Sequence, residues 1–380
     1  MINGALDNIK VLDLGQDISA PYCAKLLADY GAEVIKVEPH GQGDSARRMG
    51  PFPGDIPNPE KSGLFLHLNM NKKGVTLNLH TREGVKILKE LVKGADILVE
   101  NYAPAHLPSL GLGYEDLEQV NPRLVMTSIT PFGQTGLYRD YKATEMGVFA
   151  MSGRMYTHGL PEREPLRYAP DISWFQTGTT AAISTLAALG QQVVVSAMEA
   201  VVGSMDYRVL LYEYTGVKSR RGDFPSGFPQ GAYPCQDGYV TFGVGQQRFF
   251  QRLCQAMGRT DLSEDPRFAT SDARTENLDE LEAIFLGWMM EHTKREIFEI
   301  CQKVRVPCSP LLGPDELLDD PQLKAREFFV EADHPQAGRL TYPGAPFRMT
   351  QTPFWVRSPA PLLGQHNTEI YSGGLGYSKD

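Results

Sequence analysis

Two short polar segments have residue types suited to holding a phosphate or another anion. Residues 15–21 (GQDISAP) follow an apolar stretch and precede a predicted helix, so their backbone N–H groups would lie at a helix N-terminus. In open α/β sheets, ligands commonly bind at the carboxyl ends of parallel strands. The loop lacks the G-x-G-x-x-G spacing of a dinucleotide site, and it also fits a plain strand-to-helix turn.

The second segment, residues 69–74 (NMNKKG), offers Lys72 and Lys73 as cations for a phosphate. Two adjacent lysines are also common on a solvated surface. From these residues alone, an anion site and an ordinary surface remain open for the segment.

Cysteine and histidine are too scattered to indicate a metal site. The five cysteines stand at positions 23, 235, 254, 301 and 308, and the eight histidines form no HExxH-type cluster. We therefore expect reduced thiols, most of them small core residues, and no bound metal.

The bulk composition indicates a globular protein of two or three domains. The chain has 380 residues, of which 42% are hydrophobic, and its net charge of -9 argues against a nucleic-acid-binding face. No apolar run is long enough to span a bilayer, and the first residues lead directly into a strand-like pattern. These features predict a cytoplasmic protein that binds neither nucleic acid nor a membrane.

The periodicity of the first 130 residues alternates between strand and helix. Strands are predicted at residues 9–14, 33–37, 75–79, 97–100 and 124–129, with helices at 21–30 and 82–93. Such β-α-β units form a parallel sheet, so a doubly wound α/β domain is expected.

The remainder of the chain predicts a smaller second domain. Residues 177–189 and 197–214 resemble buried helices, and residues 237–327 combine a strand with charged amphipathic helices. The Pro- and Gly-rich tail, residues 334–380, is expected to return to the body of the protein. The predicted ranges are 1–215 for the first part of the large Rossmann-like domain, 216–330 for a small α+β domain, and 331–380 for the returning segment.

Seven segments along the chain carry a family resemblance. They are IKVLDLGQDISAPYCAKLLADYGAEVIKVE, GDSARRMGPF, NMNKKGVTLNL, ADILVENYAP, LGLGYEDLEQVNPRLVMTSITPFGQTG, QVVVSAMEA and GAYPCQDGYV. Together they extend over nearly the whole sequence and resemble the family III CoA-transferases, the carnitine and formyl-CoA transferase family. The resemblance implies a large Rossmann-like domain, a smaller domain and a dimer of two interlocked chains. It also implies coenzyme A or acyl-CoA as substrate.

The resemblance further implies a nucleophilic aspartate, which attacks the acyl-CoA carbonyl and forms a mixed anhydride and then an aspartyl-CoA thioester. That aspartate normally stands four residues before a glycine, in a stretch resembling P-L-R-x-x-x-x-x-x-D-x-x-x-G. Counted from Pro165 and from Gly178, the position is occupied here by Trp174. The nearby carboxylate, Asp171, stands three residues earlier. We therefore expect no catalytic residue on this chain, with Asp171 as the alternative nucleophile.

Other positions match or depart from the family's CoA-contacting segments. Ile18 stands where some members have a glutamine near the acyl group, Ser109 where a basic residue often holds phosphate, and residues 103–105 (APA) where an Arg-Pro-Gly run is frequent. The positions expected at the CoA site are Gln16, Ile18, Lys36, His40, Asn71, Lys72, Lys73 and Asn101. They would either bind CoA or persist as scaffold. Gly190 alone stands where the family usually has a longer basic connection; either the connection is short here, or a segment is missing from the sequence.

A chain without its nucleophile fits a heteromeric enzyme. Within the family it looks most similar to the non-catalytic subunit of two-subunit enzymes that move CoA from succinyl-CoA to (R)-benzylsuccinate in anaerobic toluene breakdown. The expected partner is a catalytic homologue, in an interlocked heterodimer or heterotetramer. The alternatives are a self-sufficient homodimer that uses Asp171, and a CoA-ester racemase or lyase on the same fold, for which His158 is the nearest histidine.

Overall fold

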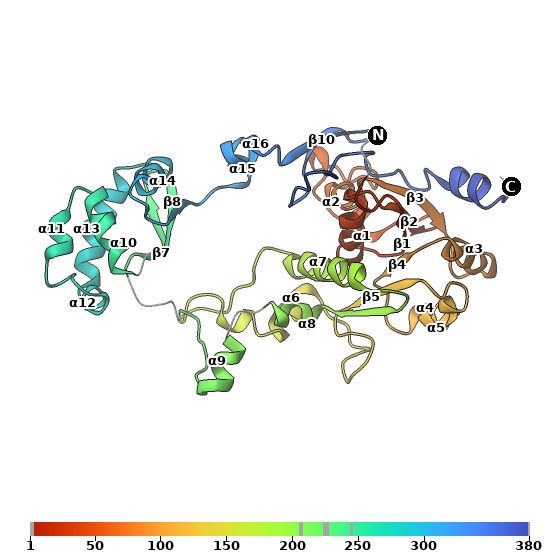
Figure 1. Ribbon diagram of the computed structural model, residues 1–380, viewed down its shortest axis with the longest axis horizontal. Helices are drawn as coiled ribbons and strands as arrows, with labels where there is room; N and C mark the ends of the chain where they lie inside the picture. Colours follow the sequence, from red (N-terminus) through yellow and green to blue (C-terminus); the bar gives the residue numbers. More distant parts are fainter. Residues whose placement is uncertain (1–3, 205–207, 223–227, 244–245, 379–380) are drawn as a thin grey trace. The chain divides into compact units, whose positions relative to one another are not determined.

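The chain divides into two compact units. The computed structural model describes residues 4–204, 208–222, 228–243 and 246–378 (Figure 1). The large unit comprises residues 1–221 and 325–380, and the small unit comprises residues 222–324. The small unit is thus inserted into the sequence of the large one, to which the C-terminal segment returns.

A six-stranded parallel sheet forms the centre of the large unit. Its order is β3-β2-β1-β4-β5-β6, with every neighbouring pair parallel. The strands are β1 (Lys10–Asp13), β2 (Glu33–Pro39), β3 (Lys72–Leu77), β4 (Ile97–Glu100), β5 (Val125–Thr130) and β6 (Gln192–Ser196). The strand order reverses beside β1, which is the place where doubly wound sheets bind ligands. The predicted α/β fold is confirmed.

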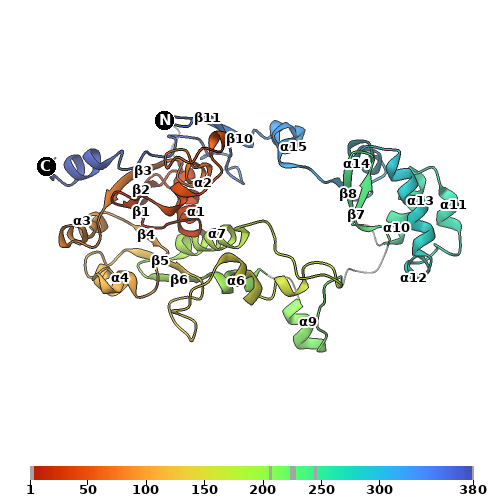
Figure 2. The same cartoon turned by 180° about the vertical axis from the view of Figure 1, so that it is seen from behind.

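Helices cover both faces of this sheet (Figure 2). On one face, α1 (Ser19–Asp29) and α7 (Ile172–Ala187) pack together over a core that includes Leu27, Val99 and Ala181. On the other face, α3 (Arg82–Lys93), α4 (His106–Ser109) and α5 (Tyr114–Glu118) cover a core that includes Leu88 and Leu98. The remaining helices of this part are α2 (Gly63–Leu68), α6 (Glu145–Met151), α8 (Ala197–Gly203) and α9 (Arg208–Thr215).

The predicted helix at residues 197–214 is wrong as a single buried element. The described part of this segment contains two helices, α8 and α9, and α9 has no buried residue. Gly203 ends α8, as expected of a residue that lowers helix stability. Helix α7 in turn begins five positions before the predicted residue 177. Residues 188–191 form the whole connection from α7 to β6, with Gly190 at a positive φ of 47°.

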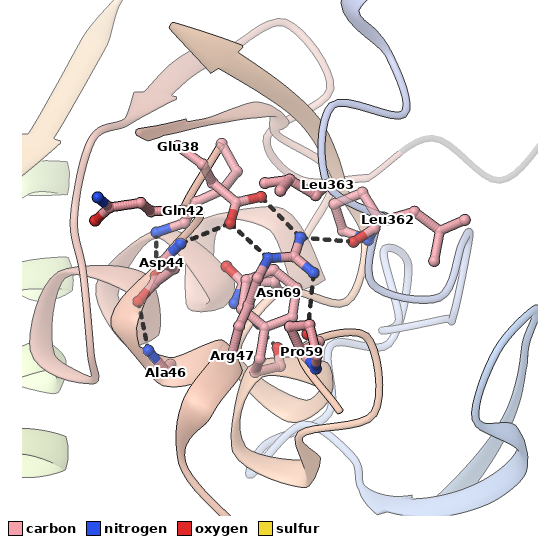
Figure 3. Close-up of polar contacts among 12 residues, drawn as sticks. Glu38, Gln42, Asp44, Ala46, Arg47, Pro59, Asn69, Leu362 and Leu363 are labelled. Carbon is pink, nitrogen blue, oxygen red and sulfur yellow. Dashed lines mark hydrogen bonds and ion pairs between the residues drawn. The ribbon is translucent and has the colours of Figure 1, made fainter. Parts of the chain in front are cut away.

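The C-terminal segment packs on the large unit near β3. A hairpin of β10 (Phe329–His334) and β11 (Gly338–Pro343) is followed by an irregular stretch and a π-helical turn at Thr368–Gly374. Figure 3 shows the Arg47 guanidinium between this segment and Glu38. Arg47 donates to both Glu38 oxygens at 2.7 and 2.8 Å and to the Pro361 carbonyl at 3.1 Å. The return of the tail to the body thus depends on a buried, charge-assisted contact.

The small unit has its own hydrophobic core. Its antiparallel sheet has the order β7-β8-β9, with β7 (Gln230–Cys235), β8 (Gly238–Gly243) and β9 (Cys308–Pro310). The helices are α10 (Gln247–Ala256), α11 (Thr260–Glu264), α12 (Ser271–Glu276), α13 (Leu278–Met290), α14 (Lys294–Lys303), α15 (Pro314–Asp319) and α16 (Pro321–Ala325). Phe250, Phe285 and Met289 are almost fully buried in its core, as expected for amphipathic helices packed on a sheet.

Candidate active site

The start of α7 contains Trp174, at the expected nucleophile position, and is preceded by Asp171, the alternative nucleophile. Asp171 precedes the helix with a φ of 67°, and its side chain makes no capping hydrogen bond. Aspartate tolerates this left-handed conformation better than most residues. The N–H of Trp174 donates to the Asp171 carbonyl at 3.0 Å, which places the indole one turn into the helix.

Close packing of α7 on α1 fixes where this turn lies. A Cβ on Gly178 would approach the Ser19 carbonyl oxygen to 2.6 Å and the Tyr22 side chain to 3.1 Å. A larger residue at 178 would therefore push α7 away from α1. The glycine four residues after Trp174 thus allows α7 to pack closely on the first turn of α1, directly after the loop at residues 15–18.

That loop is tied to the end of β4 by reciprocal hydrogen bonds. The Gln16 N–H donates to Asn101 Oδ1 at 2.8 Å, and Asn101 Nδ2 donates to the Gln16 carbonyl at 2.8 Å. The neighbouring Glu100 carboxyl accepts from the Tyr102 N–H at 2.7 Å. Burial raises the pKa of Glu100 from its ordinary value of 4.5 to about 7. Asn101, predicted as a CoA contact, therefore shapes the loop directly.

A cavity of about 680 Å³ opens between this loop and α7, and we call it the Trp174 cavity. Its lining brings together four of the predicted positions, Ile18, Asn101, Asp171 and Trp174. The other lining residues are Asp17, Ser19, Met49, Ile129, Thr130, Pro131, Ala143, Thr144, Glu145, Met146 and Arg167. Trp174 also packs on Val148, Ala197 and Val201. The indole thus forms part of an apolar wall, and no histidine is among these lining residues.

The Trp174 cavity has an acidic character. Burial, Glu145 and Asp17 together raise the pKa of Asp171 above its usual range, and Arg167 opposes this shift. Glu145 is 8% exposed, and its Oε1 accepts from the Ser173 hydroxyl at 2.5 Å. Three carboxylates therefore share the cavity with a single guanidinium.

A second cavity of about 460 Å³, the His40 cavity, lies at the ends of β2, β3 and β4. It contains two predicted CoA positions, Gln16 and His40. Its other lining residues are Val37, Glu38, Pro39, Gln42, Gly43, Arg48, Leu77, Asn78, Leu79, His80, Tyr102 and His106. The Tyr102 and His106 rings stack with their centroids 4.7 Å apart. Burial and His80 lower the pKa of His106.

Sequence reasoning missed the roles of Arg48, His80, Tyr102 and His106 at this cavity. The available signal was their position after three strands of one parallel sheet, since the carboxyl ends of such strands meet at one edge. An aromatic and basic lining suits a ring system that carries phosphate.

Lys36 and Lys72 do not line either cavity. Both are buried in a cluster with Asp13 and Asp44, which we call the buried charge cluster. Lys36 Nζ lies 2.7 Å from Asp44 Oδ2, and Lys72 Nζ lies 2.8 Å from Asp13 Oδ2. Burial lowers the pKa of Lys72 to about 8, despite the opposing effect of Asp13. Since both ammonium groups are occupied inside the chain, the structure gives no support to a phosphate contact through them.

Three further positions also have internal partners. Asn71 is 6% exposed, and its side-chain oxygen accepts from the Arg357 N–H at 2.6 Å. Lys73 is partly exposed and forms ion pairs with Glu33 and Glu369, each at 2.8 Å. Ser109 is exposed and donates to the His106 carbonyl at 2.7 Å. A contact between CoA and Asn71 or Lys73 stays a prediction, as does the weakening of the site by Ser109.

Among the described residues, no group of three or more His, Cys, Asp and Glu side chains has the arrangement of a metal site. No described helix combines the length and apolar composition that crossing a membrane requires. The five cysteines are buried free thiols, and burial raises the pKa of Cys23 to about 12.

Comparison with known proteins finds relatives along nearly the whole chain. The model for CoA-transferase family III matches residues 6–367. A succinyl-CoA–D-citramalate CoA-transferase of Chloroflexus aurantiacus is 36% identical over 389 residues, covering 99% of this chain and 95% of the relative. The beta subunit of the succinyl-CoA–L-malate CoA-transferase of the same organism is 33% identical over 386 residues, covering 98% and 94%.

The same relationship is seen in a solved structure. The crystal structure of a CAIB/BAIF family protein from Brucella suis matches with a TM-score of 0.88 and 28% identity, covering 98% of this chain and 99% of that one. The family model over residues 6–367 and the relative at 36% identity show that this chain belongs to family III of the CoA-transferases.

Proposed function

We propose that this chain is the non-catalytic subunit of a heteromeric CoA-transferase. The observation that carries the proposal is the position of Trp174, whose indole lines the cavity where the family's nucleophilic aspartate is expected. An acyl group can be passed through an anhydride only if a carboxylate oxygen attacks the thioester, and an indole cannot do this. The covalent steps would therefore take place on a partner chain that has aspartate at this position.

One relative supports a heteromer, and two support the substrate class. One is named as the beta subunit of a CoA-transferase, and the names of both contain succinyl-CoA and a dicarboxylic acid. We propose succinyl-CoA or a similar acyl-CoA as donor. The proposed acceptor is an aromatic dicarboxylic acid such as (R)-benzylsuccinate, which rests on the overall sequence resemblance. The partner would be a homologous catalytic chain, interlocked with this one.

The CoA contact proposed for this chain is the His40 cavity. Gln16 and His40 lie there beside Arg48 and the Tyr102–His106 stack. These groups supply a cation and aromatic faces, which suit the nucleotide end of CoA. Ile18 and Asn101 would instead face the acyl end, since both line the Trp174 cavity.

Reconstitution tests the proposal. The chain is purified alone and together with a homologue that has aspartate at the Trp174 position, and CoA transfer from succinyl-CoA to a panel of dicarboxylic acids is measured. Turnover is expected only from the pair, with aromatic acids preferred. Turnover by this chain alone would contradict the proposal.

A second candidate, a self-sufficient homodimer, is favoured by one observation: the Asp171 carboxylate lines the same cavity without a capping hydrogen bond. If Asp171 is the nucleophile, succinyl-CoA will leave an aspartyl-CoA thioester on the purified chain and release succinate. Hydroxylamine will convert that thioester to an aspartyl hydroxamate and release CoA. Asp171→Asn would abolish the hydroxamate, while Asp140→Asn, at an exposed aspartate, would not. Asparagine is a suitable replacement because it also tolerates a positive φ.

A further inference from the structure

The start of β10 and the irregular stretch after β11 enclose a cavity of about 570 Å³ within the large unit, and we call it the aromatic cavity. Five of its fourteen lining residues are aromatic, whereas aromatic residues make up 9% of the whole chain. They are Phe328, Phe329, Phe347, Phe354 and Trp355. A cavity of this size and composition suits a flat ligand of about two fused rings.

The walls of the aromatic cavity are held in place by contacts with the rest of the large unit. The Phe347 ring stacks on Tyr30 with the centroids 4.3 Å apart, and the Tyr30 hydroxyl donates to the Phe347 carbonyl at 2.9 Å. Farther along the stretch, Asn71 Nδ2 donates to the Trp355 carbonyl at 3.4 Å. The cavity is therefore formed before any ligand binds, which lowers the entropic cost of binding.

The aromatic side chains offer accessible surface to a ligand. Phe347 is 48% exposed although Tyr30 covers one face of its ring, so the other face is open. Phe354 and Trp355 are partly exposed. Contiguous apolar surface around a hollow is typical of a ligand-binding groove.

The charges at the aromatic cavity favour an anion. Arg326 and Arg348 are opposed by Glu327, and the other lining residues are uncharged. Arg348 lies 3.7 Å from the Glu327 carboxylate. Among the residues that the structure describes, none forms a hydrogen bond or ion pair with the Arg326 side chain. On a chain with a net charge of -9, this excess of guanidinium groups would attract a carboxylate, which matches their fork of donors.

From these observations we infer that the aromatic cavity binds a planar aromatic carboxylate, whose ring packs on the open face of Phe347 and whose carboxylate pairs with Arg326. The inference goes beyond the proposed subunit function, because it concerns reversible binding and requires no transfer of CoA. The aromatic cavity shares no lining residue with the Trp174 cavity or the His40 cavity. This chain would therefore bind an aromatic acid at a place separate from the proposed acyl-CoA contacts.

Calorimetric titration of the full-length chain with 2-naphthoate tests this inference at neutral pH. Two probes of similar shape isolate its parts: 2-naphthamide has the rings without the charge, and decahydro-2-naphthoate has the charge without an aromatic ring. 2-Naphthoate is expected to bind about tenfold more tightly than either. Equal binding of the amide or of the saturated acid would overturn the inference, as would the absence of 2-naphthoate binding.

Variants locate the site. Arg326→Gln is expected to weaken 2-naphthoate binding about tenfold, and Arg326→Gln/Arg348→Gln to weaken it further. Both arginines are exposed, so these variants should fold. Arg163→Gln, at an exposed arginine that lines none of the three cavities, is the matched control and should leave binding unchanged. Unchanged affinity in the double variant would contradict the proposed site.

Phe347→Leu tests the aromatic wall separately. It keeps an apolar side chain but removes the ring face, so a severalfold loss of 2-naphthoate affinity is expected, with little change for decahydro-2-naphthoate. An equal loss for both acids would show that the ring is not read by Phe347 and would overturn this contact.

The outcome is separable from that of the subunit proposal. Binding of 2-naphthoate is measured on this chain alone, whereas the subunit role is measured by CoA transfer in the reconstituted pair. If the isolated chain binds 2-naphthoate but the pair does not, a segment of the partner chain covers the aromatic cavity in the assembly. That result would overturn the ligand assignment and leave the transferase proposal intact.

Discussion

The buried charge cluster and the Trp174 cavity lie on either side of the same loop and use similar residues in opposite ways. In the cluster, Asp13 and Asp44 each have a lysine within 2.8 Å, and none of the charges is accessible. In the cavity, three carboxylates face one guanidinium, and one buried carboxylate oxygen has no partner among the described residues. Paired charges hold the loop in place, whereas unpaired charges leave interactions available for a ligand.

The largest effect is expected when aspartate replaces Trp174 at the family's nucleophile position. In Trp174→Asp, a carboxylate stands at the family's nucleophile position, and the rate of acyl-adduct formation from succinyl-CoA should rise about a thousandfold or more. Mass spectrometry of the intact chain measures the adduct. Trp174→Asn is the matched control, because asparagine has the same size as aspartate but its amide cannot form an anhydride. If a folded Trp174→Asp chain forms no adduct, the cavity lacks other groups that the reaction requires besides a carboxylate at position 174.

Within the cluster, Asp13→Ala removes the carboxylate that Lys72 and Lys36 share. Lys36 keeps Asp44 at 2.7 Å, but the Lys72 ammonium would then be buried without a carboxylate partner. The free energy of unfolding should therefore fall by about 3–5 kcal/mol. Urea denaturation followed by circular dichroism measures this change. Asp140→Ala, at an exposed aspartate, should have little effect. Equal stability of the two variants would refute a structural role for the cluster.

The burial of Glu100, which directly precedes Asn101, predicts that the stability of the chain depends on pH. Its pKa is raised from 4.5 to about 7 by burial, so the folded chain holds this proton more tightly than the unfolded chain does. The resulting stabilisation is complete below pH 4.5 and is lost as the pH rises through 7. It amounts to about 3 kcal/mol.

Glu100→Gln isolates this contribution. Between pH 5 and pH 8, the free energy of unfolding of the parent should decline relative to that of the variant, which has no proton to release at this position. Urea denaturation of both proteins at each pH gives the difference. Parallel profiles would show that Glu100 is not buried as the structure has it.

The smallest effect is expected at Lys73, which is adjacent in sequence to Lys72. Its ion pairs with Glu33 and Glu369 are partly exposed to solvent. Such pairs contribute about 0–1 kcal/mol, so Lys73→Met should change the free energy of unfolding by less than about 1 kcal/mol. Thermal denaturation in low and high salt provides the measurement. If Lys73→Met lowers the free energy of unfolding as much as Asp13→Ala does, the contrast between a partly exposed Lys73 and a buried Lys72 is wrong.

Much of the large unit could be predicted from periodicity, because β1 to β5 are apolar segments separated by helices or turns. Strand β6 and helix α9 were harder to predict. The first follows a connection of only a few residues, and the second is apolar but exposed. Exposure of an apolar helix depends on which surfaces meet in three dimensions, and no local pattern records that.

The site was predictable only in part. Trp174, Ile18 and Asn101 line one cavity, and the assignment of Trp174 to the nucleophile position by its spacing from Pro165 and Gly178 stays a prediction. The partners of Lys36 and Lys72 were not foreseen, because they depend on β1 lying next to β2, and β2 next to β3. Strand order brings Asp13 to these lysines, whereas the sequence separates Asp13 from Lys72 by 59 positions.

The pairing of β3 with the C-terminal segment has a consequence for synthesis of the protein. The His366 N–H donates to the Gly74 carbonyl, and the Thr76 N–H donates to Asn367 Oδ1, so these residues cover the outer edge of the sheet. On the ribosome, that edge stays uncovered until residues 366 and 367 have been translated. A prematurely terminated chain would retain an uncovered strand and would be prone to aggregate.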